Sequence, residues 1–249
     1  MATTITGTTI DVGTNVIVTD AAGKVGVGTA SPANYYADEL VVTAADEGGM
    51  TLVTGTGHAN YIAFADGTSG NAAYRGFVKY DHANDKMTLG TAGTSAIEVN
   101  VIGNVTMPLQ PAFQVRPSSA QTNIATSGNV TVVLGSEIFD QNSDFNTSNS
   151  LFTAPVTGKY QFNFVIRLDN IDTAANYYQT RIVTSNRTYE MTQQLNRFSA
   201  DVQYWNMPTM AALADMDAGD TAFFEVSQSA GTAQTDIVDT TVVSGYLVC

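Results

Sequence analysis

The stretch 158-GKYQFNFVIRL-168 alternates between apolar and polar side chains along most of its length. Its apolar series is Tyr160, Phe162, Phe164, Ile166 and Leu168. Gln161, Asn163 and Arg167 occupy positions between them. Because successive side chains of a strand point to opposite faces, this pattern predicts a β-strand with one buried face.

The same alternation recurs along the C-terminal half of the chain, whereas helical periodicity is nearly absent. Similar runs are 130-VTVVL-134, 221-TAFFEV-226 and 242-VVSGYLV-248. Turn-forming residues separate these runs, since Gly, Asn, Asp and Pro interrupt regular structure. The best helical candidate, 208-PTMAALADM-216, is short. The sequence therefore predicts an all-β fold.

The N-terminal half has shorter apolar runs separated by Gly, Thr, Ala, Asn and Asp, such as 62-IAF-64 and 87-MTL-89. Strands this short bury little area within one chain, and such segments usually gain stability by winding with copies of themselves. Three prolines mark the change of texture and favour an extended linker: Pro108, Pro111 and Pro117. We therefore predict a thin, β-rich stem over residues 1–110, which winds with copies of itself, and a separate head over residues 111–249.

Composition limits the kinds of partner that the protein can have. The chain of 249 residues is 44% hydrophobic, which is enough for a core, but only 13% charged. Ten Lys and Arg against 23 Asp and Glu give a net charge of −13, which argues against nucleic-acid binding and against an anionic membrane surface. No apolar run is long enough for membrane insertion, and the start MATTITGTTIDVGTN lacks the features of a signal peptide. The single cysteine, Cys249, cannot form an intrachain disulfide.

Four stretches follow one another in the C-terminal half: 113-FQV-115, 139-FDQNSDFNTSNSLFTAPVTGKYQFNF-164, 213-LADMDAGDTAFFEV-226 and 240-TTVVSGYLV-248. In content and order they resemble the C1q/TNF family of globular heads. The matching residues are Phe139, Asp144, Phe145, Phe152, Pro155, Gly158, Tyr160, Phe162, Gly219, Asp220, Gly245, Tyr246 and Leu247. The resemblance implies a ten-stranded jelly roll on a slender trimeric stem, with the head assembled as a homotrimer around a three-fold axis.

Three phrases of the N-terminal half carry a second resemblance: 23-GKVGVGTASP-32, 61-YIAFADGTSGNAAYRGFVKYDHANDKMTLGTAG-93 and 97-IEVNVIGNVTM-107. They are similar to fibre and virion-surface proteins of tailed bacteriophages. The last phrase departs from the usual pattern, because it runs into Thr-Met-Pro rather than Gly-Val-Gly or Gly-Ile-Gly. The resemblance implies that the N-terminal region attaches to other virion proteins.

Enzyme motifs are missing from the sequence. The glycines of 23-GKVGVG-28 are not followed by a phosphate-binding Lys-Ser, and His58 and His82 have no partner at metal-ligand spacing. Three acidic residues cluster at Asp215, Asp217 and Asp220. A glycan hydrolase needs two carboxylates about 5–10 Å apart across a cleft. The favoured interpretation of this cluster is a solvated turn, so we predict no catalytic residue.

Two further groups of residues are candidates for binding. The oxygen donors of Asp140, Asn142, Asp144 and Asn146 alternate along one loop and would suit Ca²⁺, although the Gly and Glu of an EF-hand are missing. Apart from this calcium option, we expect no cofactor. The second group is Tyr177, Tyr178, Tyr204 and Trp205. These four are interpreted either as a platform on which sugar rings stack, or as core and trimer-interface residues.

A phage-like stem followed by a C1q-like head predicts a non-enzymatic trimeric fibre or knob on the surface of a phage particle, made in the host bacterial cytoplasm. Loops of the head would bind a glycan or protein of the host surface. Three alternatives stay open: a capsid decoration or head fibre, a fibre-borne glycan depolymerase, and a secreted C1q-like lectin. The last is disfavoured because the sequence has neither a signal peptide nor disulfides.

Overall fold

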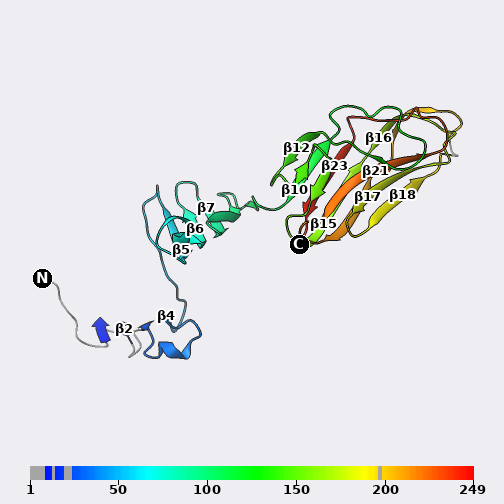
Figure 1. Ribbon diagram of the computed structural model, residues 1–249. Coiled ribbons are helices and arrows are strands. Elements are labelled where there is room, and N and C mark those ends of the chain that lie inside the picture. The colour runs from blue at the N-terminus through cyan, green and yellow to red at the C-terminus, as the bar shows by residue number, and fades with distance from the viewer. Residues whose placement is uncertain (1–8, 13–14, 20–23, 196–197) are drawn as a thin grey trace. The chain divides into compact units, whose positions relative to one another are not determined.

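The computed structural model describes residues 9–12, 15–19, 24–195 and 198–249. Contacts divide the chain into two compact units, residues 1–60 with 81–83, and residues 61–80 with 84–249. Figure 1 shows the strands from blue at the N-terminus to red at the C-terminus. Part of the predicted attachment region, residues 1–8, lies outside the described residues. In the described part of the chain, no helix is long and apolar enough to cross a membrane.

The N-terminal strands form a small sheet in the order β1-β2-β3-β4. Their bounds are β1 (Thr9–Val12), β2 (Asn15–Thr19), β3 (Val25–Val27) and β4 (Leu40–Val42). A 3-10 helix, η1 (Pro32–Asn34), lies between β3 and β4, which pair in parallel. Val41 is buried, whereas its neighbours Leu40 and Val42 are exposed. Two apolar side chains of β4 are therefore left in solvent.

The middle of the chain forms a second sheet in the order β5-β6-β7-β8-β9. Its strands are β5 (Ala59–Phe64), β6 (Gly76–Asp81), β7 (Lys86–Thr91), β8 (Thr94–Val99) and β9 (Val105–Thr106). A 3-10 helix, η2 (Gly70–Tyr74), joins β5 to β6. The alternation typical of strands gives this sheet two different faces.

One face of the middle sheet is covered and the other is not. On the covered face, the Phe77 ring packs edge-on against Tyr61 of β5 and Tyr74 of η2, with ring centroids 6.2 and 6.4 Å apart. The opposite face, here called the open face, consists mainly of exposed apolar side chains: Ile62, Phe64, Met87 and Leu89. No element among the described residues of this sheet covers them, so the open face leaves its apolar area in solvent.

The head is a sandwich of two antiparallel sheets, as predicted. The first sheet has the order β12-β10-β23-β15-β20. Its strands are β10 (Ala112–Arg116), β12 (Ser136–Asp140), β15 (Gly158–Val165), β20 (Met210–Met216) and β23 (Val242–Leu247). The stretch that predicted the fold supplies β15, which pairs with β20 and β23.

The second sheet of the head has the order β13-β14-β21-β17-β18, and β11 also pairs with β21. Its strands are β11 (Val130–Thr131), β13 (Phe145–Asn146), β14 (Leu151–Thr153), β17 (Tyr177–Thr184), β18 (Thr188–Gln193) and β21 (Thr221–Ser229). A three-stranded sheet of β19 (Val202–Asn206), β16 (Arg167–Ile171) and β22 (Asp236–Ile237) completes the head. The architecture is an all-β jelly roll.

Aromatic rings fill the space between the two main sheets. Phe113 stacks on Phe152 with ring centroids 5.0 Å apart, and Phe162 meets Phe152 and Phe224 edge-on at 5.6 and 6.1 Å. All four rings are buried. Buried aromatic side chains dominate the apolar stabilisation of a core, because each typically removes about 150–250 Å² from water.

The candidate helix at residues 208–216 is wrong, because this segment forms β20. Met210, Ala212, Ala214 and Met216 are buried, and the residues between them are more exposed. This alternation has period two. Alanine has a high intrinsic helix propensity, but pairing with β15 overrides it here.

Candidate functional site

The outward face of the first head sheet carries no charged side chain across its centre. Two rows of paired residues cross it: Phe139, Gln114, Ser244, Asn163 and Ala211, and next to them Ala112, Tyr246, Gln161 and Leu213. We call these nine residues the uncharged face. Three of its large apolar side chains are about half exposed, Phe139 at 49%, Tyr246 at 47% and Leu213 at 55%. Covering this face with another protein surface would not require the desolvation of a charged side chain.

The outward face of the second head sheet is different. Glu225, Arg181 and Glu190 lie opposite one another across β21, β17 and β18. The Arg181 guanidinium lies 3.1 Å from the Glu190 carboxylate. Burying this row of charges in an interface would cost desolvation energy, whereas the charges stay hydrated when the face is exposed. We therefore expect this face to remain in contact with solvent.

The four aromatic candidates do not form one exposed platform. Tyr178 is fully buried and Trp205 is only 9% exposed; their rings meet edge-on with centroids 6.0 Å apart. Tyr204 is 57% exposed and lies under the Arg167 guanidinium, 4.8 Å from the ring centroid. Tyr177 is half-buried. Neighbours along a strand point to opposite faces, which separates Tyr177 from Tyr178 and Tyr204 from Trp205.

The Tyr178 hydroxyl belongs to a buried polar cluster. It lies 2.6 Å from Thr235 Oγ1 and accepts a hydrogen bond from the Asp172 N–H at 3.1 Å. Burial raises the pKa of Tyr178, while the hydrogen bonds from Thr235 and the Asp172 backbone oppose the rise. This hydroxyl is buried in the head and forms hydrogen bonds with neighbouring buried polar groups, so its role is structural.

The predicted calcium loop is held by its own hydrogen bonds. The Asp140 carboxylate accepts the N–H groups of Asp144 and Phe145 at 3.2 and 2.9 Å. Burial and the nearby charge of Asp140 raise the pKa of Asp144, against a hydrogen bond from Asn142. Asp144 Oδ2 is buried without a hydrogen-bond partner. Within the described residues, no three His, Cys, Asp or Glu side chains form a metal-ligand group. Calcium at Asp140 and Asp144 stays a prediction.

The acidic residues between β20 and β21 have partners that fix a turn. The Asp220 carboxylate accepts the Asp217 N–H at 2.8 Å and the Asn186 side-chain amide at 2.9 Å. Asp215 forms an ion pair with Arg187 at 2.9 Å. Gly219 has a φ of +92°, a conformation that residues with a Cβ rarely adopt. The cluster is therefore built as a tight turn between two strands.

The residues that carry the resemblance of the head lie in three kinds of place: the core, the uncharged face, and crowded positions that favour a small residue. Phe145, Phe152, Tyr160 and Phe162 are buried, and the Tyr160 hydroxyl donates to the Val156 carbonyl at 2.7 Å. Phe139 and Tyr246 belong instead to the uncharged face. Two glycines of the set lie where space is short, Gly158 at the start of β15 and Gly245 within β23, and Pro155 lies just before β15. The thiol of Cys249 is free and exposed.

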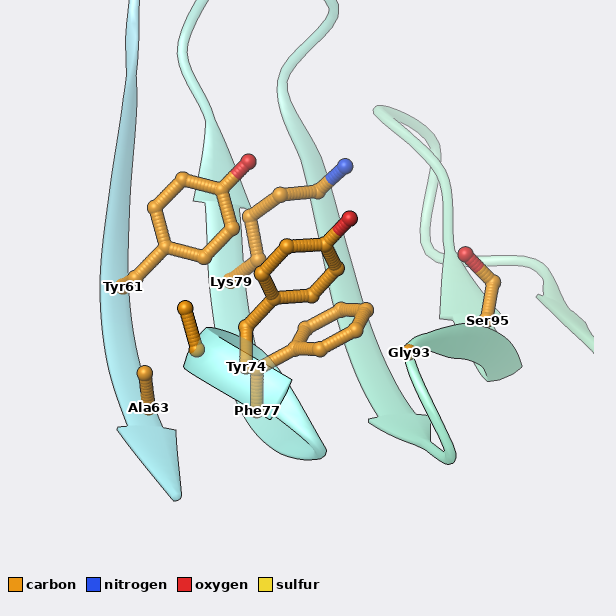
Figure 2. Close-up of a pocket in the computed structure, with 8 residues that line it drawn as sticks. Tyr61, Ala63, Tyr74, Phe77, Lys79, Gly93 and Ser95 are labelled. Carbon is orange, nitrogen blue, oxygen red and sulfur yellow. The ribbon is translucent and has the colours of Figure 1, made fainter. Parts of the chain in front are cut away.

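A pocket that the sequence analysis missed lies on the covered face of the middle sheet (Figure 2). It has a volume of about 500 Å³. Its lining residues are Tyr61, Ala63, Ala73, Tyr74, Phe77, Lys79, Gly93 and Ser95. They come from β5, η2, β6, β8 and the turn before β8. The only sequence signal was the period-two placement of Phe77 and Lys79 within one strand.

A family model described as the C1q domain matches residues 112–248. The chain belongs to the C1q domain family. The match spans the head from β10 to β23. C1q/TNF-like domains typically serve as binding or structural modules rather than as enzymes, and they commonly form trimers.

Several solved structures are similar to the C1q head. The globular domain of zebrafish complement 1qA protein is 18% identical, with a TM-score of 0.41, and the match covers 56% of this chain and 98% of that chain. Murine APRIL at pH 8.0 is 10% identical, with a TM-score of 0.42, covering 56% and 99%. The vertex protein P5 of PRD1 is 11% identical, with a TM-score of 0.38, covering 56% and 96%. No curated protein matches the chain.

Proposed function

We propose that this protein is a trimeric, non-enzymatic fibre or knob of a phage particle. Its C1q head would make contact with a glycan or protein of the host surface, and its N-terminal region would attach to other virion proteins. The protein would thus be displayed on the virion surface after synthesis in the host cytoplasm. Several trimers on one particle would give avidity even where each single contact is weak.

The observation that carries this proposal is the uncharged face of the head. It places Phe139, Tyr246 and Leu213 in solvent, each about half exposed, on a sheet whose centre carries no charged side chain. The opposite sheet carries the ionic row through Arg181. If copies of this chain meet, contact through the uncharged face buries apolar area without desolvating an ion pair. The three-fold axis would therefore run past the uncharged face.

The open face of the middle sheet supports the same assembly. Phe64 is 63% exposed, and Met87 and Leu89 are 44% and 43% exposed. A sheet with one apolar face in water is unstable as a monomer, because that face must be covered to gain hydrophobic stabilisation. Two further copies of the stem would cover it. This is the reason to propose a trimeric stem as well as a trimeric head.

The phage assignment rests on the phrases of the N-terminal half, above all 61-YIAFADGTSGNAAYRGFVKYDHANDKM-87. In the structure this phrase supplies β5, η2, β6 and the start of β7, which together form both faces of the middle sheet. The phrase therefore forms part of the folded middle sheet. The open face of the same sheet is the surface that we propose is covered by further copies of the chain.

Assembly is tested by the mass in solution, measured by light scattering after size exclusion. Three chains of 26.3 kDa give about 79 kDa. Leu213→Asp places a charge on the uncharged face and should reduce the mass toward that of one chain. The matched control is Val133→Asp, which changes another half-exposed side chain (50%) outside that sheet and should leave the trimer intact. A monomeric wild type, or dissociation by both variants alike, would refute the trimer.

Attachment is tested with labelled wild-type protein on host cells and with competition against phage adsorption. Binding and competition are expected. Location on the particle, by electron microscopy with labelled antibody, distinguishes a tail fibre from a capsid decoration. Release of reducing ends from host capsule would contradict the non-enzymatic assignment and favour the depolymerase.

A further inference from the structure

The pocket of the middle sheet is directed away from the face that a trimer would cover. Tyr61 and Ala63 alternate with Ile62 and Phe64 along β5, so the pocket and the open face lie on opposite sides of the sheet. Contact between copies through the open face would therefore leave the pocket accessible. Tyr61 is 51% exposed and Tyr74 is 39% exposed, whereas Phe77 at the base is buried.

Backbone hydrogen bonds hold the walls of the pocket in place. The N–H groups of Asp66 and Gly67 donate to the Ala72 carbonyl in η2, at 3.0 and 3.1 Å. The Gly93 N–H donates to the Arg75 carbonyl at 3.0 Å, which ties the turn before β8 to the end of η2. Tyr74, at the end of η2, packs its ring against Phe77. The pocket is therefore preformed, which reduces the entropy cost of binding a ligand.

The side chains of the pocket combine aromatic faces with one cation. Figure 2 shows the Lys79 amine and the Tyr61 and Tyr74 hydroxyls toward the same end of the pocket. Among the described residues, six Lys and Arg side chains form ion pairs. Lys79 forms none with any described residue, and no Asp or Glu lines the pocket. In a chain of net charge −13, the lining of this pocket therefore carries one positive charge and no negative charge.

We propose that this pocket binds an acidic sugar, a pyranose ring that carries a carboxylate. The C–H groups of a pyranose carry partial positive charge and pack on the electron-rich faces of aromatic rings, here Tyr61 and Tyr74. The carboxylate pairs with the Lys79 amine, and the Ser95 and tyrosine hydroxyls bond to the sugar hydroxyls. A volume of about 500 Å³ is in the range of small-ligand sites and exceeds one sugar ring. This site is separate from the head and goes beyond the proposed function.

The test uses the full chain and isothermal titration calorimetry with sodium glucuronate, glucose and sodium benzoate. Glucuronate should bind saturably, with a dissociation constant in the millimolar range, about fivefold or more tighter than glucose. Lys79→Met should remove this preference while leaving weak glucose binding. Tyr61→Ala should weaken both sugars. The matched control is Lys159→Met, which removes the same charge from an exposed position in the head and should change nothing.

Three results would overturn the inference: no saturable glucuronate binding to the wild type, equal affinity for glucuronate and glucose, or undiminished preference in Lys79→Met. Benzoate that binds more tightly than glucuronate would overturn the carbohydrate assignment. The solution mass of each variant is measured in parallel. A trimer that fails to bind glucuronate refutes this site and leaves the proposed function standing, whereas a monomeric wild type refutes the proposed trimer instead.

Discussion

Adding a single methyl group at Gly245 should destabilise the head. Gly245 lies in β23, opposite Phe113 of β10 on one side and Phe162 of β15 on the other. A Cβ atom on Gly245 would lie 2.6 Å from Cε1 of Phe113 and 2.7 Å from Cδ1 of Phe162. Carbon atoms in contact normally stay about 3.5–4.0 Å apart, so both rings would have to move.

The surroundings of the two rings set the magnitude. Phe113 is already packed against Phe145 and Phe152, with centroids 5.0 Å away in both cases. Neither ring has free space to move into, because both belong to the buried core. Overpacking of this kind typically costs about 1–3 kcal/mol. For a domain of the length of the head, that corresponds to a fall in the unfolding midpoint of about 3–10 °C.

Fluorescence of Trp205 during thermal unfolding is the assay. Trp205 is the only tryptophan in the chain and lies in the head, so the signal reports the head alone. Gly57→Ala is the control, because a Cβ atom on Gly57 meets nothing within 4 Å. Combining Gly245→Ala with Phe113→Leu should cost less than the sum of the two single changes, since the smaller side chain makes room. A midpoint for Gly245→Ala within about 1 °C of the wild type would refute the reasoning.

Three further changes test other parts of the head. Asp144→Asn should raise the free energy of unfolding at pH 7. The pKa of Asp144 is raised in the folded state, so ionisation of this carboxyl destabilises the fold as the pH rises above its ordinary value of 3.8. Urea denaturation across pH should show the gain disappearing below that value, and a gain that persists there would contradict the prediction. Tyr178→Phe should cost about 1–3 kcal/mol in urea unfolding, since Thr235 loses its buried partner, and an unchanged midpoint would contradict this. Gly219→Ala should lower the free energy of unfolding by about 1–2 kcal/mol in the same assay, because Gly219 has a φ of +92°. Asparagine tolerates this conformation better, so Gly219→Asn should lower it less, and equal losses for the two variants would exclude backbone strain as the cause.

Strand positions could be predicted from the sequence where large apolar residues alternate with polar ones. Tyr160, Phe162 and Phe164 show this in β15, and all three are buried. The β20 segment was mistaken because two of its four inward residues, Ala212 and Ala214, are alanines. Alanine gives weak periodicity and favours helices in isolation. The partner strand, rather than local propensity, decides such a segment.

The uncharged face and the pocket of the middle sheet could not be predicted from the periodicity of the sequence. The uncharged face combines Phe139, Tyr246 and Leu213 only because β12, β10, β23, β15 and β20 lie in that order and register. Register between distant strands is set by packing of the whole head. The pocket of the middle sheet was missed for the same reason: Tyr61 and Lys79 come together through strand pairing and through the placement of η2. The sequence left two interpretations of Tyr178 and Trp205 open, and the burial of both side chains in the head is information that only the structure contains.

The position of β23 between β10 and β15 has a consequence for how the head is made. Residues 112 and 246 face each other across two neighbouring strands, so the first sheet cannot close until nearly all of the head has been synthesised. Until then β10 and β15 each have an unpaired edge, and the rings of Phe113 and Phe162 are exposed to solvent. Both features favour aggregation. Distant pairings of this kind also slow folding. Conditions that lower the rate of synthesis or the temperature should therefore increase the soluble yield of the protein.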